Sequence, residues 1–139
     1  MHSASPFSEV TDATLEQLVR RFYGRVRADA ELGPVFETAV HDWEAHFETL
    51  TDFWSSVMLT SGRYHGRPMQ VHMRLPIRPE MFQRWLAIWG ETADELFAPE
   101  IAERLRAKAA TIARSLQLGL FFRPEDEAPA AKACSNPPA

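Results

Sequence analysis

Residues 42–76, DWEAHFETLTDFWSSVMLTSGRYHGRPMQVHMRLP, decide the fold of this chain. In the first half of this stretch, apolar residues recur at steps of three and four, which predicts a helix with one apolar face. Asp42 suits the start of this helix as its N-cap, and Ser61-Gly62 suits its end. His46 shares the apolar face, so we expect its imidazole to point inward. The face comprises Trp43, His46, Phe47, Leu50, Phe53, Trp54, Val57 and Met58.

The second half of the stretch, residues 66–76, has room for at most two turns of helix. Pro68 suits a first helical turn, whereas Pro76 disfavours helical geometry at Leu75. His72 therefore lies on a short segment that is held between two prolines.

The rest of the chain predicts further helices and no strand, because no segment alternates convincingly with a period of two. We expect helices over about residues 14–29, from residues 77–79 to about 98, and over about residues 99–122, with Thr14 and Gln17 as a capping box in the first. The predicted inward face of the first helix is Leu15, Leu18, Val19, Phe22, Tyr23 and Val26, and that of the last is Ile101, Leu105, Ala109, Ile112, Leu116 and Leu120. Residues 32–36, Leu-Gly-Pro-Val-Phe, predict a sharp corner, since glycine and proline oppose helix continuation. The expected fold class is all-α.

Length and charge limit the class of protein. The 139 residues predict one domain at 11–122, a flexible leader at 1–10 and a disordered tail rich in Pro and Ala at 123–139. The net charge of -4 and the lack of Lys or Arg blocks argue against nucleic acid and membrane surfaces as partners. The chain lacks a signal peptide and any apolar run of transmembrane length, so we expect a cytoplasmic protein.

Inward-facing aromatic and histidine residues are the candidate functional residues. A haem pocket needs aromatic and aliphatic walls, one imidazole for the iron and space on the far side. His72 is a candidate ligand, although a surface or hydrogen-bonded histidine has the same local pattern. Tyr23 and Trp85 also fit interior aromatics whose polar atoms meet neighbouring carbonyls. Spacing alone does not decide between these interpretations.

Two further hypotheses concern His46 and the arginines near His72. His46 fits a core histidine with satisfied hydrogen bonds, or a non-haem metal site with Asp42 and a histidine at 41, 65 or 72. The metal site lacks a second ligand pair on another helix. Arginines at 63, 67, 74 and 78 flank the His72 segment and include candidate partners for haem propionates.

The ordered set of motifs is more specific than its members. The set is Phe22-Tyr23, Asp29-x-x-Leu32-Gly33-Pro34-x-Phe36, Trp43-x-x-His46, Asp52-Phe53-Trp54-Ser55-Ser56, Tyr64-x-Gly66-x-Pro68, His72-x-x-Leu75-Pro76 and Phe82-x-x-Trp85-Leu86. In this order the motifs resemble the group III truncated haemoglobins of the globin superfamily, over about residues 15–120. The resemblance implies a two-over-two helical sandwich with a very short proximal helix.

The resemblance also implies a cofactor and a set of site residues. The cofactor would be non-covalent haem b, because the single cysteine, Cys134, excludes a CxxCH attachment. His72 would bind the iron through Nε2, with a backbone carbonyl accepting from Nδ1. The distal hydrogen-bond donors would be Tyr23, His46 and Trp85. The residues packing on the porphyrin would be Phe36, Leu50, Leu75 and Phe82.

Three functions follow from these expectations. The first is binding of O2, CO and NO at an iron that can remain five-coordinate. The second is enzymatic, either NO dioxygenation or peroxidase-like chemistry, and would need a separate reductase because the chain lacks a GxGxxG fingerprint. The third is a haem-free helical module that only binds partners.

Overall fold

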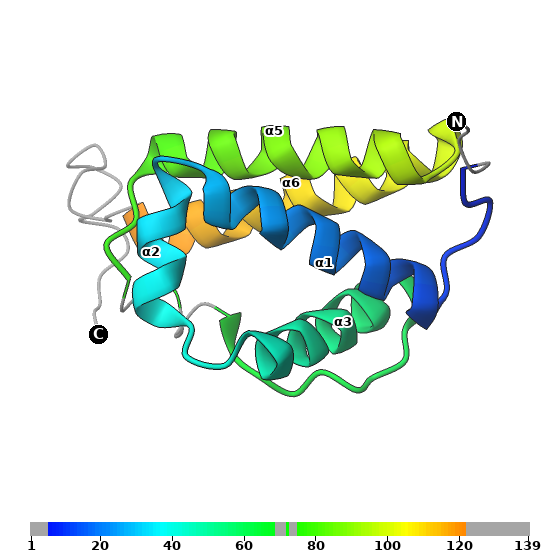
Figure 1. The fold of residues 1–139 in the computed structure, drawn as a ribbon, viewed down its shortest axis with the longest axis horizontal. Coiled ribbons are helices and arrows are strands. Elements are labelled where there is room, and N and C mark those ends of the chain that lie inside the picture. Colours follow the sequence, from blue (N-terminus) through cyan, green and yellow to red (C-terminus); the bar gives the residue numbers. More distant parts are fainter. Residues whose placement is uncertain (1–5, 69–71, 73–74, 122–139) are drawn as a thin grey trace, which may run out of the picture.

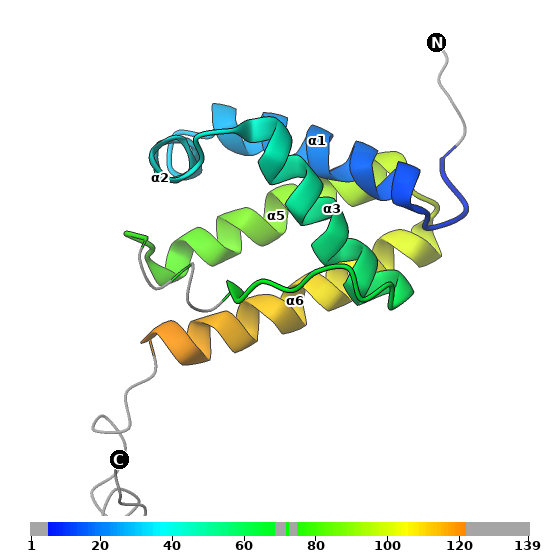
Figure 2. The same ribbon diagram turned by 90° about the horizontal axis from the view of Figure 1, so that it is seen from below.

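The computed structural model of the protein describes residues 6–68, 72 and 75–121. Its helices are α1 (Asp12–Ala28), α2 (Leu32–Ala39), α3 (Trp43–Leu59), α5 (Pro79–Leu96) and α6 (Pro99–Phe121). Helix α1 packs against α2, α3 and α5, and α5 packs along α6. Figures 1 and 2 show α1 and α3 lying across the pair formed by α5 and α6. The predicted all-α, two-over-two arrangement is therefore confirmed.

Helix α1 begins earlier than the sequence analysis predicts. The Thr11 side chain accepts a hydrogen bond from the backbone N–H of Thr14 at 3.1 Å, and the Thr14 hydroxyl oxygen accepts from the backbone N–H of Thr11 at 2.8 Å. This reciprocal capping box replaces the predicted one at Thr14 and Gln17, because Thr14 is already the third residue of the helix. The predicted inward face is confirmed as the buried residues Leu15, Leu18, Val19, Phe22, Tyr23 and Val26.

The predicted corner at residues 32–36 is wrong, because α2 begins there. Pro34 lies in the first helical turn, where its missing N–H costs no hydrogen bond. The Asp29 carboxylate accepts from the backbone N–H groups of Glu31 at 3.0 Å and Leu32 at 2.9 Å, which satisfies the start of the helix. Gly33 lets α2 approach α1 closely, since a Cβ on Gly33 would lie 2.7 Å from the Arg27 carbonyl oxygen.

Helix α3 is capped as predicted. The Asp42 carboxylate accepts from the Ala45 backbone N–H at 3.2 Å. The helix ends at Leu59, its C-cap Thr60 has a left-handed φ of 53°, and Gly62 follows with a φ of 74°. The chain therefore leaves α3 in a tight turn and continues without helix or strand over residues 60–67.

Trp89 joins three helices at the centre of the core. The indole is 1% exposed and stacks on Trp54 of α3 at a centroid distance of 4.3 Å and on Trp85 of α5 at 5.9 Å. Its Nε1 donates to the carbonyl oxygen of Leu105 in α6 at 3.1 Å. A buried indole with a satisfied N–H and two stacked neighbours fixes how these helices sit.

The described part of the leader, residues 6–10, differs from the flexible segment that we expected. The Phe7 backbone N–H donates to the Leu96 carbonyl, and the Phe7 carbonyl accepts from the Ala98 N–H, both at 2.8 Å. The Phe7 ring also meets the Phe97 ring edge-on at 5.5 Å. Hydrogen bonds and a ring contact at Phe7 therefore hold the leader against the turn between α5 and α6. The tail at 123–139 lies outside the described residues, so the predicted domain boundaries stay predictions.

Among the described helices, none is both long enough and apolar enough to cross a membrane.

Substitution of two glycines tests how closely α2 approaches α1. We expect Gly33→Ala to lower the free energy of unfolding by about 1–3 kcal/mol, because the added methyl group meets backbone atoms that cannot move freely. Gly24→Ala is the matched control, since a Cβ there has nothing within 4 Å; it should be neutral or stabilising by up to about 1 kcal/mol. Urea unfolding of both variants measures the difference, and equal effects would contradict the close approach.

Candidate functional site

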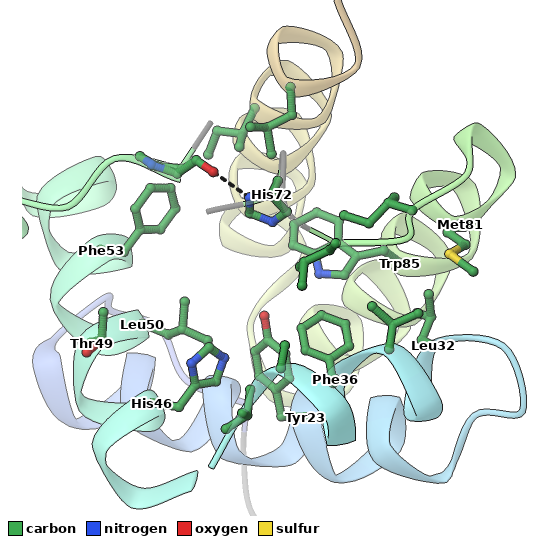
Figure 3. A pocket seen from close by; sticks show the side chains of 18 of the residues that line it. Tyr23, Leu32, Phe36, His46, Thr49, Leu50, Phe53, His72, Met81 and Trp85 are labelled. Atoms are coloured by element: carbon green, nitrogen blue, oxygen red, sulfur yellow. Dashed lines mark hydrogen bonds between the residues drawn. The ribbon is translucent and has the colours of Figure 1, made fainter. Parts of the chain in front are cut away.

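A cavity of about 440 Å³ lies between the helices. Its walls are mostly apolar, and they come from all five helices and from the chain around residues 64–77. Figure 3 shows the side chains that enclose it. All of the predicted site residues line this one cavity: Tyr23, Phe36, His46, Leu50, His72, Leu75, Phe82 and Trp85.

His72 lies on one side of the cavity (Figure 3). Its Nδ1 is 2.6 Å from the carbonyl oxygen of Pro68. Because a carbonyl can only accept, this contact assigns the proton to Nδ1 and leaves the lone pair of Nε2 free. The predicted backbone acceptor for Nδ1 is therefore confirmed. Pro68 and His72 both have helical backbone, whereas residues 69–71 and 73–74 lie outside the described part of the chain.

Tyr23 lies on the opposite side of the cavity from His72, with its hydroxyl group pointing across it (Figure 3). The side chain is 5% exposed and is held edge-on by Phe22 at 4.6 Å and Phe36 at 5.4 Å. Burial raises the pKa of Tyr23 well above its usual value, and the Trp85 indole only partly opposes this rise. The hydroxyl therefore stays protonated near neutral pH and can donate a hydrogen bond into the cavity.

Trp85 forms the wall beside Tyr23 (Figure 3). Its ring is stacked on Trp89 with an interplanar angle of 4°, and the Phe22 ring meets it edge-on at 5.6 Å. These contacts fix the plane of the indole at the cavity wall.

His46 carries a buried polar atom that lacks a partner. Its ring meets Tyr23 and Trp43 edge-on, each at 5.5 Å. Within the described residues, Nε2 of His46 is buried with no hydrogen-bond partner, which contradicts the hypothesis of a core histidine with satisfied hydrogen bonds. An unpaired buried nitrogen is costly, and native structures normally give such an atom a function. Burial also lowers the pKa of His46, so the ring stays neutral near pH 7.

The chain is similar to proteins of known family. The model of the bacterial-like globin family matches residues 8–116. The group 3 truncated hemoglobin ctb of Campylobacter jejuni is 30% identical over 120 residues, which cover 83% of this chain and 94% of that protein. The chain belongs to the group III truncated haemoglobins. The crystal structure of the group III truncated hemoglobin from Campylobacter jejuni matches with a TM-score of 0.81 at 29% identity, covering 85% of this chain and 97% of that one.

Membership in this globin family implies haem binding, and the residues present fit that cofactor. The cavity is apolar and of the size typical of small-molecule sites, about 300–1,000 Å³. His72 presents a free Nε2 on one side, and the Tyr23 hydroxyl group stands on the opposite side. The unpaired His46 nitrogen also fits a site that a polar ligand completes. A haem-free interaction module accounts for none of these features.

Two of the arginines considered as propionate partners are engaged elsewhere. Arg63 forms ion pairs with Asp12 and Asp52. Arg78 pairs with Glu31 and Glu80. Neither arginine lines the cavity. Arg67 is exposed, and position 74 lies outside the described residues.

The structure also contradicts the hypothesis of a non-haem metal site. Across residues 6–68, 72 and 75–121, no group of three or more His, Cys, Asp or Glu residues is placed to hold a metal ion.

Several lining residues were not assigned to the site by the sequence analysis. Tyr64 and Pro68 line the cavity although they follow the end of α3. Their only sequence signal was the Tyr64-x-Gly66-x-Pro68 motif. On α6 the signal was the predicted apolar face, which brings Ile112 and Leu116 to the cavity.

The lowered pKa of His46 predicts a pH dependence of stability in the haem-free protein. The folded state binds a proton at His46 less readily than the unfolded chain, so stability should fall as the pH drops below about 6.5, by at most about 1.4 kcal/mol per pH unit. Urea unfolding at several pH values measures this slope. His46→Leu should reduce it, whereas His41→Gln, at an exposed position, should leave it intact. An unchanged slope in His46→Leu would show that His46 is not buried as described.

Proposed function

We propose that this globin binds haem b without a covalent bond, with Nε2 of His72 as the proximal ligand, and that it binds O2, CO and NO on the opposite face. The observation that carries the proposal is the hydrogen bond from Nδ1 of His72 to the Pro68 carbonyl, with the Tyr23 hydroxyl facing His72 across an apolar cavity. Phe36, Leu50, Leu75 and Phe82 would pack on the porphyrin.

Haem iron, when bound, supplies reversible binding of diatomic gases. The Pro68 carbonyl fixes the His72 tautomer and increases the electron density at Nε2, which strengthens it as a ligand. The chain thereby presents one imidazole in a set orientation.

Tyr23 and Trp85 would donate hydrogen bonds to the bound gas. Both are held by neighbouring rings, so little side-chain freedom is lost when they donate. Neutral His46 has one N–H and one acceptor nitrogen, so it either donates to the gas or accepts from the Tyr23 hydroxyl. The haem iron would supply electron density to a bound gas, and these donors would stabilise the charge on its oxygen atom. We therefore expect a high affinity for O2, dominated by slow dissociation.

The same donors suit chemistry in which charge develops on oxygen atoms, as in reactions with NO or peroxide. Such a use would require a separate electron donor, and it stays a prediction of the sequence analysis.

Visible absorption spectra of the haem-loaded protein test the proposal. We expect one haem per chain, a sharp Soret band and a stable CO complex for the wild type. His72→Gly should weaken the band and the CO complex, and added imidazole should restore them, because free imidazole fills the space that the side chain leaves. His65→Ala is the control, since His65 is exposed and does not line the cavity. Failure of the wild type to take up haem, or an unaltered spectrum for His72→Gly, would refute the proposal.

Substitution of the distal donors tests their role in O2 binding. A hydrogen bond to a charged group contributes about 1.5–3 kcal/mol, so loss of both donors in Tyr23→Phe/Trp85→Phe should raise the O2 dissociation rate by a factor on the order of a hundred to ten thousand. Stopped-flow mixing measures this rate. Met81→Leu is the control, because it changes a residue of the cavity wall without removing a hydrogen-bond donor. If neither single substitution alters the rate, the distal assignment is wrong.

A further inference from the structure

The position of the Pro68 carbonyl depends on a segment with little regular structure. Residues 60–67 form neither helix nor strand, and they connect the end of α3 to Pro68 (Figure 2). Most of these residues are exposed. Contacts with the helices must therefore fix this loop, which we call the 60–67 loop, if the carbonyl is to stay 2.6 Å from Nδ1 of His72.

Arg63 ties the loop to two helices. Its Nε donates to the Asp52 carboxylate at 3.0 Å, and its Nη2 donates to the Asp12 carboxylate at 2.7 Å. Nη2 also donates to the hydroxyl oxygen of Ser55, which is 0% exposed, at 3.1 Å. Arg63 lowers the pKa of Asp12, and the two carboxylates raise the pKa of Arg63. The start of α1, the middle of α3 and the loop therefore meet at one guanidinium group.

Tyr64 continues this attachment toward Pro68. Its backbone N–H donates to the Ser56 hydroxyl oxygen at 3.0 Å, and its ring meets Phe53 edge-on at 5.1 Å. Its hydroxyl group lies where a Cβ on Gly66 would be, so glycine at this position lets the Tyr64 ring keep its place. Tyr64 and Pro68 both line the cavity. Contacts with α3 thus hold the loop at Tyr64, four residues before Pro68, which accepts from His72.

We propose that Arg63 and Tyr64 are positioning residues that set the strength of the hydrogen bond between the Pro68 carbonyl and His72, and through it the strength of the bond from His72 to iron. The inference rests on the proposed role of His72. It also explains the contacts of Ser55 with Arg63 and of Ser56 and Gly66 with Tyr64. Gas binding alone does not explain these contacts.

The physical basis is the steep dependence of a hydrogen bond on geometry. A small displacement of the Pro68 carbonyl lengthens its contact with Nδ1, and Nε2 then becomes a weaker donor of electron density to the iron. Arg63 does not line the cavity, and its contacts with Asp12, Asp52 and Ser55 hold the loop that leads to Pro68. Its ion pairs link three segments, namely the start of α1, the middle of α3 and the loop.

Resonance Raman spectroscopy of the ferrous haem-loaded protein tests the inference, because the iron–histidine stretching frequency reports the strength of that bond. We expect Arg63→Gln to shift this frequency downward and Arg63→Lys, which keeps the charge but not the planar fork, to restore it only in part. His65→Gln is the control in the same loop. His65 is exposed and does not line the cavity, so this variant should keep the wild-type frequency.

Ser56→Ala provides a second test if Arg63→Gln does not fold, since it removes only the partner of the Tyr64 N–H and should shift the frequency in the same direction. An unshifted frequency in a folded Arg63→Gln or Ser56→Ala variant, even with a lower melting temperature, would overturn the inference and leave these residues a purely structural role. A shift of equal size in His65→Gln would overturn it as well. Absence of an iron–histidine band from the wild type would instead refute the proposed function.

Discussion

A small chain has to keep a large cavity open, and the rest of the structure depends on this constraint. Native interiors are normally packed without voids, because side chains that face a void lose dispersion contacts. Here about 440 Å³ lies within a chain of 139 residues. The aromatic frame resists collapse: Trp89 stacks between Trp54 and Trp85, and the Phe22 ring meets both Trp85 and Trp89 edge-on. Large rings with satisfied polar atoms are suited to bracing a cavity.

The polar groups of the cavity are divided between two environments. On one side, Nδ1 of His72 has a carbonyl partner in the protein, so only Nε2 is available to a ligand. On the other side, Nε2 of His46 is buried without a partner, and the Tyr23 hydroxyl points into the cavity. The first arrangement suits an atom that needs one strong, oriented ligand. The second suits a small polar molecule whose own atoms would satisfy these groups. This asymmetry matches a globin better than it matches a general apolar pocket.

Much of this arrangement followed from the sequence, because local periodicity determines which helix face is buried. The inward face of α1 and the inward position of His46 were predictable in this way. Helix α2 was missed because Gly33-Pro34 suits both a corner and a first helical turn. The Asp29 carboxylate accepts from the Leu32 backbone N–H, and this hydrogen bond stabilises the start of the helix.

Contacts between residues far apart in the sequence could not be predicted. Arg63 binds carboxylates 51 and 11 residues away, and no local pattern indicates such pairs. The attachment of Phe7 to the turn between α5 and α6 is a further example. The unpaired state of the His46 nitrogen likewise depends on neighbours from other helices.

The central claim is that His72 holds iron in this cavity opposite Tyr23. Anomalous X-ray diffraction at the iron absorption edge, from crystals of the haem-loaded protein, tests this claim most directly. The account predicts one iron peak per chain within bonding distance of Nε2 of His72, with the Tyr23 hydroxyl on the far face of the porphyrin. An iron peak on His46, or one outside the cavity, would contradict it.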